Sequence, residues 1–277
     1  MCIRDRTREI RALLPSGAPM LAATATATKA IREDICCKLE MVSCKVVCVS
    51  PDRSNVYYEV VRRTDLEQDM HPLLQELRAN KIKTQRVIIY CRSLNLCSAL
   101  YFFFLSNLGV DSYYTLGAEQ VSDNRLFDMF HAQTPQHNKD VILTSMQRED
   151  GVVRVVFATV ALGMGVNFVG LNKMIHYGAP SSIEDYFQEC GRAGRTGGQA
   201  KSTIYWRPSD APLRRDMSDA RNVEIAAVRH YLENNSECRR YQLLSYFGEK
   251  LTNNRDRLLC FDTCAALACT SSENQDN

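Results

Sequence analysis

The chain has 277 residues, 45% of them apolar, which is enough material for about one to three small units with packed cores. Its formal net charge of +2 does not by itself point to a nucleic-acid partner. The chain lacks an uninterrupted run of about 18 apolar residues, and its start lacks the apolar segment of a signal peptide, so we expect neither a membrane span nor a secretory leader.

Residues 1–50 are typical of the end of a larger domain. We expect a helix, then a strand ending in the Ala-Thr repeats of residues 21–28, a helix over Ala30–Leu39 and a strand over Lys45–Val49. The repeats are interpreted as a strand leaving its sheet rather than as a low-complexity tract. A linker at residues 50–52, Ser-Pro-Asp, separates this part from the next.

The middle of the chain begins with an apolar helix. Residues Leu94–Leu108 predict this helix, and its Tyr-Phe-Phe-Phe run at 101–104 is interpreted as core packing rather than as a base-stacking platform. Residues 134–151 are rich in polar side chains and predict a long loop or an insertion. Several of the twelve cysteines lie on apolar segments, where a buried free thiol is the better interpretation: Cys36, Cys48 and Cys97.

Residues 152–206 alternate between strands, turns and a helix. In chain order we expect a strand over 152–157, a turn containing Gly163 and Gly165, a strand over 173–177, a helix over 182–192 and a strand over 200–206. This order is typical of an α/β fold with a parallel sheet.

Two arginines follow that helix on a short glycine-rich segment. Residues 188–195 read Gln-Glu-Cys-Gly-Arg-Ala-Gly-Arg, so that Arg192 and Arg195 lie three positions apart. The guanidinium group keeps its charge and offers a planar fork of donors that matches a phosphate group. The pattern is typical of a clamp on a transferring phosphoryl group, although the arginines alone also fit a solvated surface loop.

Five segments resemble motifs of superfamily 2 helicases and follow one another along the chain in the order of that family. Their residues are most similar to those of the RecQ family of DNA helicases. Residues 158–167 and 188–195 resemble motifs V and VI, residues 21–28 resemble motif III, residues 87–93 resemble motif IV, and residues 238–249 resemble the start of the RecQ zinc-binding subdomain. A further pattern, Arg53-x-Asn55-x-x-Tyr58, resembles the entry to the second RecQ lobe.

The resemblance implies the fold. Residues 54–207 would form a RecA-like parallel sheet with flanking helices, the helicase C-terminal lobe. Residues 1–50 would be the tail of the first RecA-like lobe. Residues 208–269 would form a small helical zinc-binding subdomain, and residues 270–277 a disordered tail.

The resemblance also assigns roles around ATP. Arg195 would stabilise the charge of the transition state on the γ-phosphate, and Arg192 would sense that phosphate and help to lock the lobes together. Gln188 would position the nucleotide or the attacking water. Gly163 and Gly165 would lie against the interface between the lobes, and Asn167 stands where some helicase families have a ribose-binding Asp.

Nucleic-acid contacts are implied at the ends of two strands. Ser93 and Thr159, with Arg92 beside Ser93, would hold phosphates of the translocated strand without reading its sequence. The alternative for Ser93 is that it simply caps its helix.

Zinc is the second implied cofactor. Cys238, Cys260 and Cys264 would be ligands in a tetrahedral site. Many relatives have a cysteine where this chain has Phe261, so Cys269 or water would complete the site. The histidines outside this pattern, His176 among them, are interpreted as structural or surface residues.

A phosphate loop of the form G-x-x-x-x-G-K-[ST] and a DEAH-type acidic motif are both missing. We therefore expect a fragment of an ATP-dependent 3′–5′ DNA helicase, with ATP and Mg²⁺ held mainly by another lobe. Its partners would be single-stranded and forked DNA, and its location intracellular, in the nucleus of a eukaryote. Two alternatives stay open: another superfamily 2 motor, such as a DEAD-box RNA helicase or a remodeller, and a non-enzymatic nucleic-acid-binding remnant.

Overall fold

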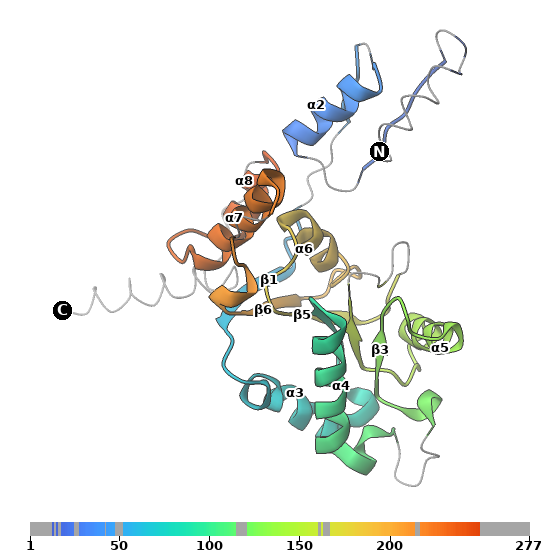
Figure 1. Ribbon diagram of the computed structural model, residues 1–277. Helices are drawn as coiled ribbons and strands as arrows, with labels where there is room; N and C mark the ends of the chain where they lie inside the picture. The colour runs from blue at the N-terminus through green and yellow to red at the C-terminus, as the bar shows by residue number, and fades with distance from the viewer. Residues whose placement is uncertain are drawn as a thin grey trace, which may run out of the picture. The chain divides into compact units, whose positions relative to one another are not determined.

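The computed structural model describes residues 13, 15, 18–24, 28–41, 43–47, 52–114, 121–159, 162, 167–213 and 217–249 (Figure 1). The chain divides into two compact units. One consists of Met1–Asp52 with Arg240–Asn254, and the other of Arg53–Arg239 with Arg255–Asn277.

The larger unit is built on a six-stranded sheet with the order β1-β6-β5-β2-β4-β3, in which every neighbouring pair is parallel. The strands are β1 Val56–Arg62, β2 Arg86–Cys91, β3 Phe127–Phe130, β4 Val155–Ala158, β5 Leu171–Tyr177 and β6 Ala200–Trp206. The predicted α/β class and parallel sheet are confirmed. Strand β6 has the predicted bounds, since turn glycines precede its alternating pattern and Pro208 follows it.

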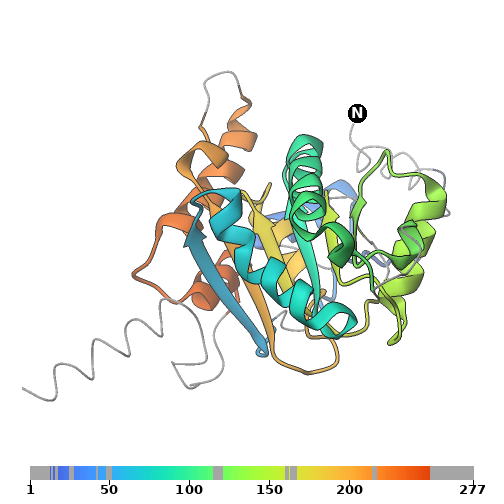
Figure 2. The ribbon, with the colours of Figure 1, turned by 90° about the horizontal axis from the view of Figure 1, so that it is seen from below.

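Helices cover both faces of this sheet. Helices α3 Leu66–Asn80 and α4 Leu94–Leu108 lie on one face, in front of the strands in Figure 2, and α6 Ile183–Cys190 lies on the other (Figures 1 and 2). Helix α5 Gln136–Gln147 lies beside β3, at the edge of the sheet (Figure 1). Helix α7 Asp219–Glu233 follows β6, and its Tyr231 ring packs 5.6 Å from the Tyr186 ring of α6.

The remaining elements are short or belong to the smaller unit. In the part of the chain that the structure describes, four 3₁₀ helices connect the others: η1 Lys81–Lys83, η2 Gly109–Ser112, η3 Ser122–Asn124 and η4 Pro208–Asp210. Helix α2 Lys29–Lys38 lies in the smaller unit, capped by Thr28, whose hydroxyl accepts from the Ile31 amide at 3.3 Å. Helix α8 Arg239–Tyr246 begins at the boundary between the units.

The main core fills the space between α3, α4 and the sheet. Phe104 of α4 is fully buried, and its ring centre lies 5.0 Å from that of Phe157 and 5.8 Å from that of Phe127. Tyr101 is buried in the same cluster, whereas Phe102 is 59% exposed. The aromatic run therefore packs in the core as predicted, except for Phe102, which points away from it.

Among the described residues, one segment, Leu94–Ser112, is long and apolar enough to cross a membrane by length and composition. The sequence did not predict this segment, because uncharged polar residues interrupt its apolar ones. The α4 part of the segment buries Cys97, Leu100 and Leu108 against the sheet, as a core helix does.

Three predicted elements differ from the structure. Residues 134–151 contain helix α5 rather than a long loop, because Ile142 and Met146, one turn apart, are buried against the sheet. Because the residues around Ile142 and Met146 are mostly polar, the apolar periodicity of a helix is weak in this sequence. In the smaller unit, the two predicted strands are wrong over their described residues, since residues 21–24 and 45–47 have no strand conformation, and residues 25–27, 48 and 49 lie outside the described residues.

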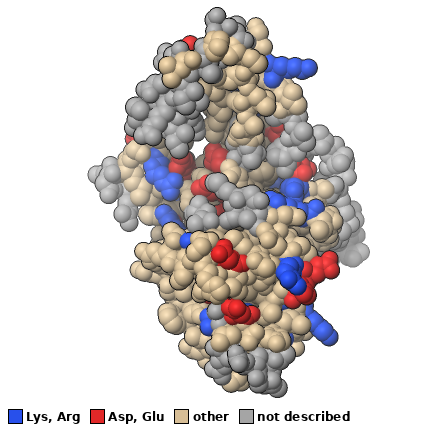
Figure 3. Space-filling model, turned by 90° about the vertical axis from the view of Figure 1, so that its right-hand side faces the viewer, with Lys and Arg blue, Asp and Glu red and all other residues tan. Residues whose placement is uncertain are grey.

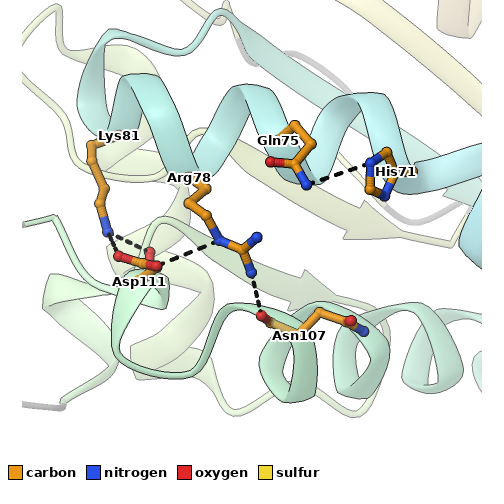
Figure 4. Close-up of polar contacts among 6 residues, drawn as sticks. All are labelled: His71, Gln75, Arg78, Lys81, Asn107 and Asp111. Atoms are coloured by element: carbon orange, nitrogen blue, oxygen red, sulfur yellow. Dashed lines mark hydrogen bonds and ion pairs between the residues drawn. The ribbon is translucent and has the colours of Figure 1, made fainter.

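Charged side chains join α3 to the end of α4 (Figure 4). The Lys81 ammonium lies 2.6 Å from a carboxylate oxygen of Asp111, and Arg78 lies 3.5 Å from the other. Arg78 also donates to the backbone oxygen of Asn107 at 2.6 Å. These cations satisfy carbonyl and carboxylate groups at the end of a helix, where positive charge is favourable.

Two of the predicted buried thiols lie among the described residues. Cys97 is buried and free, and its thiol lies 3.3 Å from the backbone oxygen of Phe157, while Cys36 is half-buried. Cys48 and residues 270–277 lie outside the described residues.

Candidate functional site

Helix α6 presents the arginine segment. Its start is fixed by Ser182, whose hydroxyl accepts from the Asp185 amide at 3.0 Å, and by Glu184 and Asp185 in the first turn. The helix ends at Cys190, two residues earlier than predicted, and residues 191–198 form what we name the arginine turn. Gln188 is exposed on the last helical turn before it.

Arg195 is the exposed arginine of this turn. Its Nη1 lies 3.4 Å from the side-chain oxygen of Asn167, and its Nε lies 3.4 Å from the backbone oxygen of Gly191. Partial burial of the guanidinium, and after it the charges of Arg192 and Arg53, lower the pKa of Arg195. Three guanidinium groups thus act together at this point, a field that favours a multiply charged anion.

Arg192 lies deeper than Arg195. It is half-buried, and its charge reaches Tyr90 on β2. Burial, and after it the charge of Glu189, raise the pKa of the Tyr90 hydroxyl, while Arg192 opposes this rise. The two arginines therefore differ in their surroundings: Arg195 faces outward beside Asn167, and Arg192 extends toward the sheet.

The arginine turn is fixed at the ends of strands where the chain enters the sheet. The Gly194 amide donates to the backbone oxygen of Leu171 at the start of β5, at 2.9 Å. Arg53 donates to the backbone oxygen of Ala193 at 2.9 Å, and the Asn55 side chain donates to Gly194 and Gly198. The sequence pattern around Arg53 and Asn55 was noticeable, but nothing in it indicated these contacts.

A buried polar pair joins α6 to β5. His176 Nε2 lies 2.7 Å from a carboxylate oxygen of Glu189, and both residues are buried. The His176 ring stacks on Tyr90 with the ring centres 5.1 Å apart and meets the edge of Tyr186 at 4.9 Å. His176 is therefore a structural residue, as interpreted from the sequence, but its partner was not foreseen.

The other group of candidate residues lies at the carboxyl ends of β2 and β4. Arg92 and Ser93 follow β2, and Thr159 follows β4, which pairs with β2 in register at Tyr90 and Ala158. The Ser93 hydroxyl accepts from the Leu96 amide at 3.2 Å, so Ser93 caps α4. A hydroxyl that caps a helix N-terminus also stands where a phosphate is favoured.

The two groups lie toward opposite ends of the sheet. The arginine turn is bonded to the start of β5, and the hydroxyl residues lie at the ends of β2 and β4, which run parallel to β5. The seven residues of β5 span about 20 Å. Gly163 and Gly165, in the segment that joins Thr159 to Asn167, lie outside the described residues.

Only one predicted zinc ligand is described. Cys238 is a free, half-buried thiol at the start of α8, and Cys260 and Cys264, with Phe261 and Cys269, lie outside the described residues. Within the described ranges no group of three or more potential metal ligands converges.

The residue after Cys238 holds the end of α7. Arg239 is 1% exposed, and it donates to the Asn234 backbone oxygen at 2.9 Å and to the Asn235 side chain at 2.6 Å. Its guanidinium also lies over the Tyr231 ring, 5.5 Å from the centre. The chain just before α8 is therefore held in place by local contacts, and Cys238 with it.

Charge is mixed on the surface. On the face shown in Figure 3, described Lys and Arg side chains lie among Asp and Glu side chains. This agrees with the small net charge and directs attention to local clusters, such as that around Arg195, rather than to a basic face.

Comparisons with known proteins identify the family of the chain. Residues 68–197 match the family model of the helicase conserved C-terminal domain, and residues 209–269 match that of the RecQ zinc-binding region. The chain is 33% identical over 244 residues to the mouse bifunctional 3′-5′ exonuclease/ATP-dependent helicase WRN, covering 84% of this chain and 16% of that protein. It is 32% identical over 241 residues to the ATP-dependent DNA helicase RecQ of Pasteurella multocida, covering 84% and 34%. The chain thus spans about a third or less of the length of these two relatives.

Solved structures share the fold. The Mycobacterium smegmatis helicase Lhr bound to ssDNA and AMP-PNP aligns with a TM-score of 0.56 at 16% identity, covering 83% of this chain and 28% of that one. Saccharomyces cerevisiae Dbp5 bound to RNA and ADP BeF3 aligns with a TM-score of 0.51 at 16% identity, covering 83% and 53%. The chain belongs to the RecQ family of helicases and comprises a C-terminal motor lobe with a RecA-like parallel sheet, followed by the zinc-binding region.

Proposed function

We propose that this chain is the second motor lobe and zinc-binding region of an ATP-dependent 3′–5′ DNA helicase. The whole protein would couple ATP hydrolysis to translocation on single-stranded DNA and to unwinding of forked duplexes. The observation that carries the proposal is the exposed Arg195 on a turn that is bonded to the start of β5 and to the segment before β1, with the charges of Arg192 and Arg53 beside it.

In the proposed ATP site this chain supplies positive charge rather than the phosphate loop. ATP and Mg²⁺ would be held mainly by an N-terminal motor lobe, and closure would bring Arg195 to the γ-phosphate. Its planar fork then stabilises charge that develops in the transition state, a contact that where measured contributes about 10³- to 10⁵-fold in rate. Arg192 would sense the γ-phosphate, and Gln188 would position the nucleotide or the attacking water.

Asn167 and the glycines would form the rest of the nucleotide-facing surface. Asn167 lies beside Arg195, so a ribose or phosphate group bound to one is within reach of the other. Gly163 and Gly165 are proposed to let backbone approach the interface between the lobes closely.

The proposed DNA path lies at the carboxyl ends of β2 and β4. Arg92, Ser93 and Thr159 come together there from neighbouring strands, and charged, hydroxyl and backbone N–H groups of this kind bind phosphates without reading sequence. Single-stranded DNA is therefore the proposed ligand of this edge. Roles in DNA repair and recombination, and a nuclear location in a eukaryote, are proposed from the family alone.

Zinc is proposed for the region after α7. Cys238, Cys260 and Cys264 supply thiolates, the ligands that structural zinc prefers, and Cys269 or water would complete the tetrahedron. Cys238 fits this role because it is half-buried at the start of α8, beside the fixed Arg239. Bound zinc would hold the chain after α8 against this point and take no part in ATP hydrolysis.

The two alternative functions would require different parts of this chain. A DEAD-box RNA helicase or a remodeller would not need a RecQ zinc-binding region, and the match over residues 209–269 favours the first proposal. A non-enzymatic nucleic-acid-binding remnant would not need Arg195. ATPase activity that depends on Arg195 would distinguish a motor from such a remnant.

The test is DNA-stimulated ATPase activity of a two-lobe protein that contains this chain. Arg195→Ala should lower kcat by about 10³-fold or more and leave ATP affinity nearly unchanged, because the contact forms mainly in the transition state. Arg195→Lys should be almost as poor, since an ammonium lacks the fork. Residues 1–277 alone should show no such activity. Equal loss of ATP affinity and turnover in Arg195→Ala would make Arg195 a ground-state ligand instead.

A further inference from the structure

The backbone of the arginine turn is intrinsically flexible. Four of its eight residues are glycine, and glycine backbones lose the most conformational freedom when they are fixed. A group that acts in a transition state must be held within about 0.5 Å of its productive position. Contacts from outside the turn must therefore supply the rigidity that its own residues lack.

The Asn55 side chain supplies the contacts that enclose Arg195. Its Nδ2 donates to the backbone oxygen of Gly194 at 2.7 Å and to that of Gly198 at 2.6 Å. These two oxygens lie on either side of Arg195 in the chain. Both N–H groups of the amide are used, and a carboxylate of the same shape has none to offer. The backbone oxygen of Asn55 also accepts from the Ala200 amide at 2.8 Å, which fixes Asn55 to the start of β6.

Gly194 is shaped to receive this amide. Its φ is +62°, a conformation that favours glycine, and a Cβ there would lie 2.5 Å from Asn55 Nδ2 and 2.9 Å from the Gly198 oxygen. The asparagine therefore fills the space that any side chain at position 194 would need. The same glycine bonds to Leu171, four residues after the Asn167 that meets Arg195.

We propose that Asn55 is the positioning residue of Arg195: its amide closes the turn from Gly194 to Gly198 and so sets the direction of the Arg195 guanidinium. This assignment rests on the proposed function of Arg195 in ATP hydrolysis. Asn55 itself touches the turn backbone and acts through it, since its side-chain donors are both engaged there.

The substitution that tests it is Asn55→Asp, which keeps the shape and replaces two donors by an oxygen facing two carbonyl oxygens. The matched control is Asn107→Asp on α4, where Nδ2 donates to the Phe103 backbone oxygen at 2.8 Å on an exposed surface. Hydrogen exchange of the purified chain should rise about 10- to 100-fold in peptides spanning residues 191–199, as expected for the loss of two hydrogen bonds. In Asn55→Asp, hydrogen exchange in β2 and β4 should stay unchanged. In Asn107→Asp, hydrogen exchange in the arginine turn should also stay unchanged. Unaltered exchange in the turn of Asn55→Asp overturns the positioning role.

The second measurement is ATPase activity in the two-lobe protein. Asn55→Asp should lower kcat by about tenfold or more with little change in the KM for ATP. In an Arg195→Lys background it should lower kcat by no more than about twofold, because two changes that act through one contact are not additive. An equal loss in both backgrounds would show that Asn55 acts by another route. If Arg195→Ala leaves ATPase activity intact, the proposed function fails, and hydrogen exchange still decides whether Asn55 holds the turn.

Discussion

Replacing Arg86 is expected to cause a large loss of stability. Arg86 opens β2 and is 2% exposed, and burial, with the charge of Arg154, lowers its pKa to about 10, so it stays charged at neutral pH. Its guanidinium donates to four backbone oxygens: Ser145 at 3.0 Å, Met146 at 3.1 Å, Val169 at 2.5 Å, and Arg148. It thereby joins the last carbonyls of α5, where positive charge is favourable, to the turn before β5.

The substitution Arg86→Met keeps apolar volume and removes every donor. Four backbone oxygens, one in a buried bond and three in partly buried bonds, then lose a charged partner, and part of this loss is recovered because no guanidinium is desolvated. We expect a net loss of about 3–5 kcal/mol, a large share of the roughly 5–15 kcal/mol that stabilises a typical domain. Arg86→Lys should lie between, because an ammonium has three donors and no planar fork.

The assay is urea unfolding followed by the fluorescence of Trp206, the single tryptophan, which is buried on β6 in the same unit. The control is Arg148→Met, which removes only an exposed ion pair to Asp150 and should leave the midpoint nearly unchanged. A change within about 1 kcal/mol for Arg86→Met would refute the reasoning, since it would mean that the four oxygens find water instead.

Two further predictions concern the turn and the metal. Gly194→Ala should lower the thermal midpoint and raise hydrogen exchange across residues 191–199, because the new Cβ would lie 2.5 Å from Asn55 Nδ2. The control is Gly197→Ala. A Cβ at Gly197 would have no atom within 4 Å, so this change should disturb the turn only through the φ of +85°. Similar effects of both changes would rule out a special role for the space beside Gly194. Metal analysis should find about one zinc per chain, which Cys238→Ala releases, making the chain after residue 208 sensitive to protease while the sheet stays folded. Cys269→Ala should weaken zinc binding if Cys269 is the fourth ligand, and chelator-free reduced protein without zinc would mean that Phe261 marks a lost site.

Helices and strands with local signals could be predicted closely from the sequence. Helix α4 has its predicted bounds because Ser93 caps one end and Gly109, at φ +51°, closes the other. Helix α5 escaped prediction because its burial depends on two residues, Ile142 and Met146, whose partners come from distant parts of the chain.

The candidate site was predictable only in part, and for the same reason. Arg192 and Arg195 are marked by spacing within eight residues, which a sequence displays directly. The contacts of Asn55 with the arginine turn join residues 139 and 143 positions apart, and no local pattern reports such a pair. The bond between His176 and Glu189 is nearer in sequence but forms only because α6 folds back over β5.

The arrangement of β5 and α6 bears on how such a lobe would transmit force. The arginine turn is bonded to the start of β5, while Ser93 and Thr159 lie beyond the far ends of β2 and β4, which run beside it. A buried hydrogen bond from His176 to Glu189, under the stacked ring of Tyr90, joins the helix, β5 and β2. Packed elements of this kind move as one body rather than deforming. If Arg195 contacts ATP as proposed, we expect closure of the lobes to displace the hydroxyls of Ser93 and Thr159 by rotation of the whole lobe.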